Sequence, residues 1–155
     1  MFYLKAIAAG ISGTLLMTGA LYLLTAITGK NYKVVGVLAT MITNHTTAGG
    51  GLTHKPADLV TGTVLHYLIG VFFAFIYFYL WDAGIGDLTI RYTIVLGALT
   101  GIFAMGFWLA FIRLHPNPPA VPVVSYVTAV GLSHVLFSLG VLIIYCLQGN
   151  SAVGK

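Results

Sequence analysis

The sequence predicts an all-α membrane protein in which four transmembrane helices form an up-and-down bundle. Two observations predict this fold class. Hydrophobic residues make up 59% of the 155 residues and charged residues only 6%, against about 25% charged in an ordinary soluble domain. The apolar residues also gather into four stretches, each long enough for the ~20-residue helix that crosses a bilayer. These stretches are residues 6–29, 59–81, 92–112 and 122–147.

None of the four stretches contains Lys, Arg, Asp or Glu. Each is apolar on all sides, whereas a helix that faces water shows a polar face, so a soluble bundle is excluded. The first stretch is longer than the 7–15 apolar residues typical of a signal peptide. We therefore expect it to be retained as the first span. The bilayer is accordingly the first expected partner of this chain.

The connections between the spans differ in length. The first, residues 30–58, contains the apolar run Val34–Ile42, which is too short to span and predicts a short interfacial helix or a re-entrant turn. A Gly-rich polar stretch, residues 43–51, follows it. The connections at 82–91 and 113–121 are short, which predicts that sequential spans are antiparallel neighbours. Residues 1–155 thus form one integral membrane domain.

The two halves of the chain resemble each other. The first and third stretches share one pattern: a small hydroxyl residue is followed directly by a Gly, and a Met lies four residues after the Gly. The second and fourth stretches share another pattern, in which a His precedes a Tyr by eleven residues. The residues are Ser12, Gly13 and Met17 with Thr100, Gly101 and Met105, and His66 and Tyr77 with His134 and Tyr145. The pattern predicts a 2+2 parallel internal repeat about an axis along the membrane normal. Chance matching between apolar segments of low diversity is the alternative.

His66 and His134 are the candidate functional residues, because ionisable side chains inside a membrane are costly and mark functional sites by default. Gly62, His66 and Gly70 recur every four residues and share one helix face, which small residues mark as a packing face. His66 should therefore point at protein. Counted along the spans, His66, His134, Met17 and Met105 lie at similar depths. The sequence predicts that they converge near the middle of the bundle.

Three uses of this site remain open. His66 and His134 are candidate cofactor ligands for a haem b iron, and Met17 and Met105 are candidate metal ligands, since thioether sulfur beside imidazole suits copper. Alternatively, each His forms a hydrogen bond with a carbonyl or with a hydroxyl such as those of Ser12, Thr14, Thr18 and Thr100. Glycine-rich packing faces favour this structural role, because haem needs a wide apolar pocket. The third use is a proton or solute pathway.

Other polar and aromatic residues predict no site. The residues Tyr77, Tyr79, Trp81, Tyr92, Tyr126 and Tyr145 stand near span ends, which is typical of an interfacial aromatic belt. We expect His45 and His54 to lie in a solvated loop. The chain has no paired carboxylates within a span, no Ser–His–acid set and no phosphate loop, so no catalytic residue is predicted. Its seven basic residues form no patch that would bind nucleic acid.

Two stretches resemble a known group of proteins. Gly10-Ile11-Ser12-Gly13-Thr14-Leu15-Leu16-Met17-Thr18 and Gly62-Thr63-Val64-Leu65-His66-Tyr67-Leu68-Ile69-Gly70 are similar to spans of the small four-span bacterial inner-membrane proteins that include the YagU-like family. This resemblance implies a multi-pass protein of the bacterial cytoplasmic membrane. We expect an accessory or homo-oligomeric membrane component, whose partners are other membrane subunits or further copies of the chain. The haem- or metal-binding bundle and the proton or solute pathway are the alternatives.

Overall fold

The computed structural model describes residues 2–149, and this part of the chain forms five helices without a strand. The helices are α1 (Phe2–Thr28), α2 (Val34–Thr43), α3 (Pro56–Asp82), α4 (Ile90–Leu114) and α5 (Val123–Gly149). All except α2 are long and apolar enough to cross a bilayer. The predicted fold class is confirmed, and the protein is a multi-pass helical membrane protein. The long helices begin and end within a few residues of the predicted spans.

The ends of the helices follow from local chemistry. Gly29 takes a φ of 70°, a left-handed conformation that favours glycine, and so ends α1. Pro56 stands in the first turn of α3, where its missing N–H costs no hydrogen bond. The Thr89 side chain accepts a hydrogen bond from the Tyr92 N–H and caps the start of α4.

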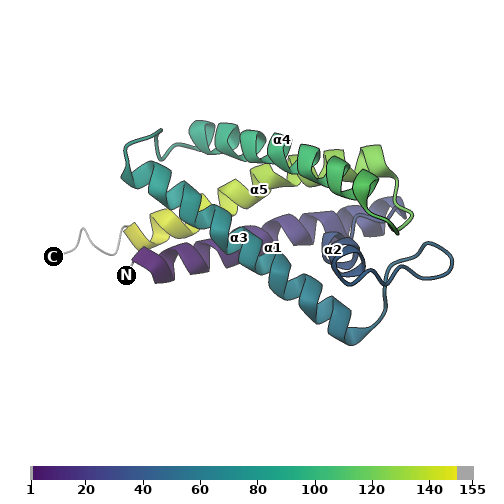
Figure 1. The fold of residues 1–155 in the computed structure, drawn as a ribbon. Coiled ribbons are helices and arrows are strands. Elements are labelled where there is room, and N and C mark those ends of the chain that lie inside the picture. The colour runs from purple at the N-terminus through teal and green to yellow at the C-terminus, as the bar shows by residue number, and fades with distance from the viewer. Residues whose placement is uncertain (1, 150–155) are drawn as a thin grey trace.

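Helix α5 occupies the centre of the bundle and packs along both α1 and α4. Helix α3 packs against α1 and α2 and crosses the others obliquely (Figure 1). The expectation that all sequential spans are neighbours is wrong for α3 and α4. Their backbones lie near each other where the short 83–89 connection joins them and diverge toward the opposite end (Figure 1).

Glycines set the close approach of the packed helices. A Cβ added to Gly13 of α1 would lie 2.6 Å from the Phe137 carbonyl oxygen of α5, and one added to Gly140 would lie 2.8 Å from the Gly13 Cα. A Cβ added to Gly10 would lie 2.5 Å from the Cα of Val71 on α3. Such close approach increases van der Waals packing between helices, which holds them together in a bilayer that provides no hydrophobic driving force for association.

The contacts between helices depart from an exact twofold. If the half α1–α3 were related by symmetry to the half α4–α5, the packing of α1 on α5 would have an equivalent in α4 on α3. The first contact is extensive, but α3 and α4 meet only through a few side chains. The similarity of the two halves therefore does not extend to this pair of helices.

Helix α2 accounts for this departure. The sequence predicts a short interfacial helix or a re-entrant turn here, and the segment forms a helix. All residues from Val34 to Met41 are buried, so the helix packs on nearly every side. It lies across the bundle at the end where α3 and α4 diverge (Figure 1). The Cβ of Ala39 would lie 2.6 Å from a Cβ at Gly62, which shows how closely α2 approaches α3. Helix α2 thus packs on α3 and, through the bond from His115 Nε2 to the Met41 carbonyl, also meets the end of α4.

The aromatic-belt expectation is wrong for three residues. Tyr77, Trp81 and Tyr126 are buried in the helical core and do not face a lipid–water interface. Tyr79, in contrast, is 70% exposed near the end of α3, as an anchoring residue should be. The difference arises because Tyr77 and Trp81 continue the buried face of α3, whereas Tyr79 lies on its outer face.

Candidate functional site: a pocket between α3 and α4

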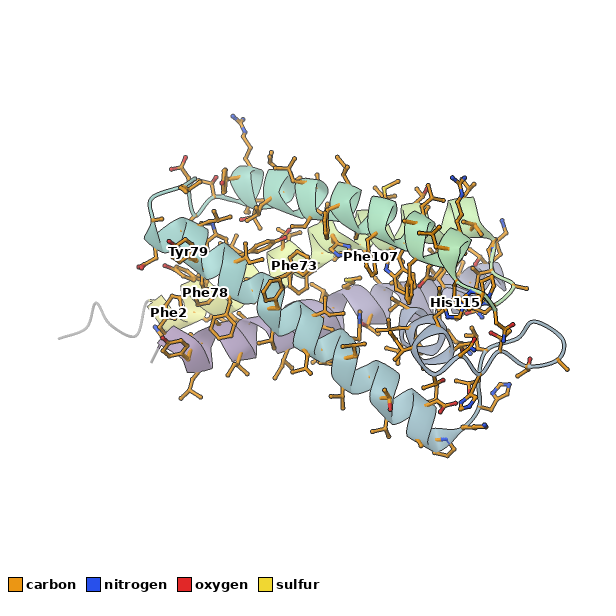
Figure 2. All side chains as sticks on the ribbon, viewed as in Figure 1. Phe2, Phe73, Phe78, Tyr79, Phe107 and His115 are labelled. Carbon is orange, nitrogen blue, oxygen red and sulfur yellow. The ribbon has the colours of Figure 1, made fainter. Side chains whose placement is uncertain are left out.

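The divergence of α3 from α4 leaves an apolar pocket of about 520 Å³. Small-molecule sites typically enclose ~300–1,000 Å³ and combine apolar walls with a few polar groups. All five helices contribute to its walls, with aromatic side chains prominent on the sides of α3 and α4. Figure 2 shows Phe73 of α3 and Phe107 of α4 on the sides of their helices that face this space. The pocket's aromatic residues are Phe72, Phe73, Phe103, Phe107, Trp108, Phe111 and Phe137.

His66 and His134 both line this pocket, together with Met17. The predicted convergence of these three residues is therefore present. Met105 does not join them: its sulfur lies against the small residue Gly131 of α5, where a Cβ would approach it to 2.5 Å. Met105 is thus the one of the four predicted residues that packs α4 against α5 instead of lining the pocket.

His66 is tied to the neighbouring helix. Its Nε2 lies 2.9 Å from the hydroxyl of Thr18 on α1, one of the hydroxyls considered as a partner. The His66 side chain is buried on the inner face of α3, which it shares with Gly62 and Gly70. The imidazole is therefore fixed between α1 and α3, at the wall of the pocket.

His134 is oriented differently. Its Nδ1 lies 2.8 Å from the carbonyl oxygen of Val130, one turn earlier on α5. A carbonyl oxygen only accepts hydrogen bonds, so Nδ1 carries the proton and donates. In a neutral imidazole, Nε2 is then the acceptor. No described residue donates a hydrogen bond to this Nε2, so it faces the pocket with a free lone pair.

These bonds limit the metal chemistry of the site. Ligation of a haem iron by Nε2 of both imidazoles would require the Thr18–His66 bond to break. His134 alone has the arrangement that is usual for a metal-binding imidazole, in which the other ring nitrogen donates to a backbone carbonyl. Within residues 2–149, no three His, Cys, Asp or Glu side chains gather as a metal-binding group.

Side-chain contacts join α3 and α4 at the end where the two helices meet. The Thr100 hydroxyl donates to the carbonyl of Leu96, so the Tyr77 hydroxyl is the donor in its 2.7 Å contact with Thr100 Oγ1. The rings of Phe73 and Phe103 also meet here, with centroids 6.3 Å apart. These two side-chain pairs join α3 and α4 on the side of the pocket that is nearer the 83–89 connection.

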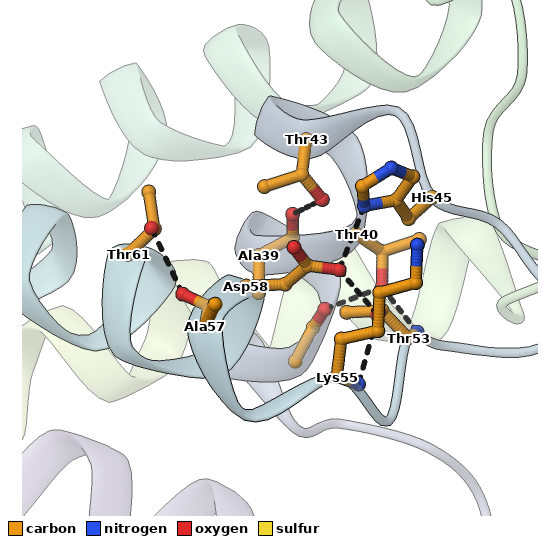
Figure 3. A network of polar contacts seen from close by, with 10 residues as sticks. Ala39, Thr40, Thr43, His45, Thr53, Lys55, Ala57, Asp58 and Thr61 are labelled. Atoms are coloured by element: carbon orange, nitrogen blue, oxygen red, sulfur yellow. Dashed lines mark hydrogen bonds and ion pairs between the residues drawn. The ribbon is translucent and has the colours of Figure 1, made fainter.

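A polar network covers the opposite end of the bundle (Figure 3). Asp58, in the first turn of α3, accepts hydrogen bonds from Thr53 Oγ1 at 2.6 Å and from His45 Nδ1 at 2.8 Å. The Thr53 N–H donates to Thr40 Oγ1 at 2.8 Å. The network therefore joins the Gly-rich loop to both α2 and α3.

The loop also binds the third connection. The Ala120 N–H donates to the Gly50 carbonyl at 2.7 Å, and the Thr46 hydroxyl donates to the Asn117 carbonyl at 2.6 Å. His115 Nε2 donates to the Met41 carbonyl at 2.8 Å. The first and third connections thus lie at the same end of the bundle and form one cap there.

The sequence interpretation missed this cap. His45 was expected in a solvated loop, and its side chain is 46% exposed, yet it is fixed by the carboxylate of Asp58. One signal was present: Asp58 is the single acidic residue near the long connection, and it lies two turns before His66 on the same face of α3. The wide pocket was missed as well, because glycine-rich helix faces suggested close packing throughout.

Comparison with known proteins adds no relative. No protein-family model matches the chain, and neither do any curated proteins or solved structures.

Proposed function

We propose that this protein binds a lipophilic molecule inside the bilayer, in the pocket between α3 and α4. The observation that carries the proposal is the pocket itself: about 520 Å³ of apolar space with two imidazoles in its walls. Apolar walls with a small number of fixed polar groups are typical of ligand sites, in which the polar groups orient the ligand.

The geometry also provides an entrance. Phe72, Phe103 and Phe107 line the pocket and are each more than half exposed on the outside of the bundle. In a bilayer these rings contact acyl chains, so a ligand dissolved in the lipid reaches the pocket without crossing the polar cap. Rotation of exposed phenylalanine side chains is fast, on the ps–ns timescale, and does not require the helices to separate.

The site, together with the resemblance stated for the sequence, supports a cellular role for the protein. The protein is a small component of the bacterial cytoplasmic membrane that holds or presents a lipophilic ligand, alone or to other membrane subunits. Binding, rather than catalysis, is the use that we propose for a pocket whose polar lining residues are Thr14, His66 and His134.

Extraction of the purified protein tests the proposal. Protein isolated in a mild detergent is extracted with organic solvent, and the extract is compared by mass spectrometry with that of the variant Ala104→Phe. Ala104 lines the pocket, and a phenyl ring there reduces its volume. We expect one class of lipophilic compound near one equivalent per chain, and its loss in the variant.

Two controls complete this experiment. The variant Ala110→Phe adds the same ring at an exposed position of α4 outside the pocket and should retain the compound. Metal analysis of the same sample identifies a competing use. Stoichiometric copper or haem iron, or equal lipid content in both variants, would overturn the proposal.

A further inference from the structure

The hydrogen bonds of the two histidines define which chemical group the pocket accepts. We infer that the ligand is a lipophilic alcohol or phenol, whose hydroxyl donates a hydrogen bond to Nε2 of His134. This inference rests on the proposed function and adds to it the class of the ligand.

The first step is the tautomer of His134. The Val130 carbonyl can only accept, so it fixes the proton on Nδ1, 2.8 Å away. A charged imidazole facing an apolar pocket within the bilayer is costly, so the ring is neutral. Nε2 is therefore an acceptor, and a ligand that fills this part of the pocket must present a donor to it.

The second step is the cost of leaving Nε2 without a partner. A polar atom that a ligand covers without a hydrogen bond lowers the affinity for that ligand. An aldehyde, a quinone or an ether carries acceptors alone, and it would cover Nε2 without bonding to it. A hydroxyl supplies the missing donor, and it can also accept a hydrogen bond from a second group.

The third step concerns His66, the other imidazole of the pocket. Its Nε2 is already engaged by the Thr18 hydroxyl at 2.9 Å. The bond to Thr18 therefore leaves Nε2 of His66 less available for a hydrogen bond to a ligand. The direction of this bond does not fix the tautomer of His66, whereas the Val130 carbonyl fixes that of His134. His134 is thus the imidazole whose free nitrogen is set as an acceptor, and it distinguishes a hydroxyl from an ether.

The chain contains a natural reporter for this selection. Trp81 and Trp108 are its two tryptophans, and Trp108 lines the pocket whereas Trp81 does not. In a Trp81→Phe background, Trp108 fluorescence therefore reports on binding. The probes are 4-octylphenol and its methyl ether, 4-octylanisole, which differ in the presence of the donor.

The protein in nanodiscs is titrated with each probe. We expect 4-octylphenol to bind about two- to tenfold more tightly than 4-octylanisole, because it makes one hydrogen bond that the ether cannot make. His134→Asn places an amide near the position of Nδ1 and removes Nε2, so the preference should disappear. His134→Gln places an amide near the position of Nε2 and should retain part of the preference.

The outcomes separate the two proposals. If neither probe changes Trp108 fluorescence and the Ala104→Phe variant behaves identically, the proposed pocket function fails. If both probes bind with equal affinity, or if His66→Asn removes the preference while His134→Asn does not, the ligand class is wrong although the pocket binds. Thermal unfolding of each variant confirms that the altered chain is folded before it is titrated.

Discussion

The Tyr77 hydroxyl of α3 donates a hydrogen bond to Thr100 Oγ1 of α4 over 2.7 Å. This bond joins two helices that have little other contact. Beyond it, toward the cap, the helices diverge and the pocket opens. The position of this pair therefore determines where α3 and α4 remain together and where they separate.

The variant Tyr77→Phe tests this connection. It removes the hydroxyl and leaves Thr100 bonded to the Leu96 carbonyl, so we expect a loss of about 1 kcal/mol in unfolding free energy. Thermal unfolding in detergent measures it. The matched control is Tyr79→Phe, which removes a hydroxyl from a side chain that is 70% exposed. Equal stability of the two variants would show that the Tyr77 bond contributes nothing.

A substitution at Gly13 tests the packing of α1 on α5. A methyl group there would meet the Phe137 carbonyl oxygen at 2.6 Å, so Gly13→Ala should separate the helices and cost about 1–3 kcal/mol. The control is Gly106→Ala on α4, where no atom lies within 4 Å of the added Cβ. This control should stabilise its helix by up to ~1 kcal/mol. A Gly13→Ala protein that unfolds at the same temperature as Gly106→Ala would contradict the packing.

The cap gives a prediction about the long loop. His45→Leu removes one of the two donors to Asp58, so residues 44–53 should open more often. Limited proteolysis of protein in nanodiscs should therefore cleave this loop faster in the variant. His54→Leu is the control, since His54 is exposed in the same connection. Equal cleavage rates would show that the His45–Asp58 contact does not hold the loop.

Much of the fold could be predicted from the sequence because the bilayer imposes length and polarity on each span. The four spans and the inward face of α3 follow from uncharged runs and from residues spaced four apart, and the Thr18–His66 contact was among the pairings considered. The choice of neighbours could not be predicted. Small residues such as Gly10, Gly13, Gly97 and Gly101 occur on both α1 and α4, and they do not specify which helix each one approaches.

The pocket and the cap depend on contacts between segments far apart in the chain. The pocket exists because α2, a helix of ten residues, packs against α3 at the end where α3 and α4 diverge. Hydrophobicity predicted a short interfacial helix or a re-entrant turn here, but it did not predict that the segment would be buried against α3. His45 and Asp58 are brought together by the path of a Gly-rich loop, whose conformation is set by bonds to α2 and to the third connection.

Distances between spin labels on α3 and α4 test the central claim most directly, namely that these helices diverge and enclose the site. In a Cys146→Ser background, one pair of labels at Val64 and Ala110 lies near the cap, and a second at Tyr79 and Val95 lies near the 83–89 connection. We predict a longer distance for the pair near the cap, measured by pulsed electron paramagnetic resonance in nanodiscs. Equal distances at both ends would mean that the axes of α3 and α4 keep a constant separation, which would leave no space for the pocket.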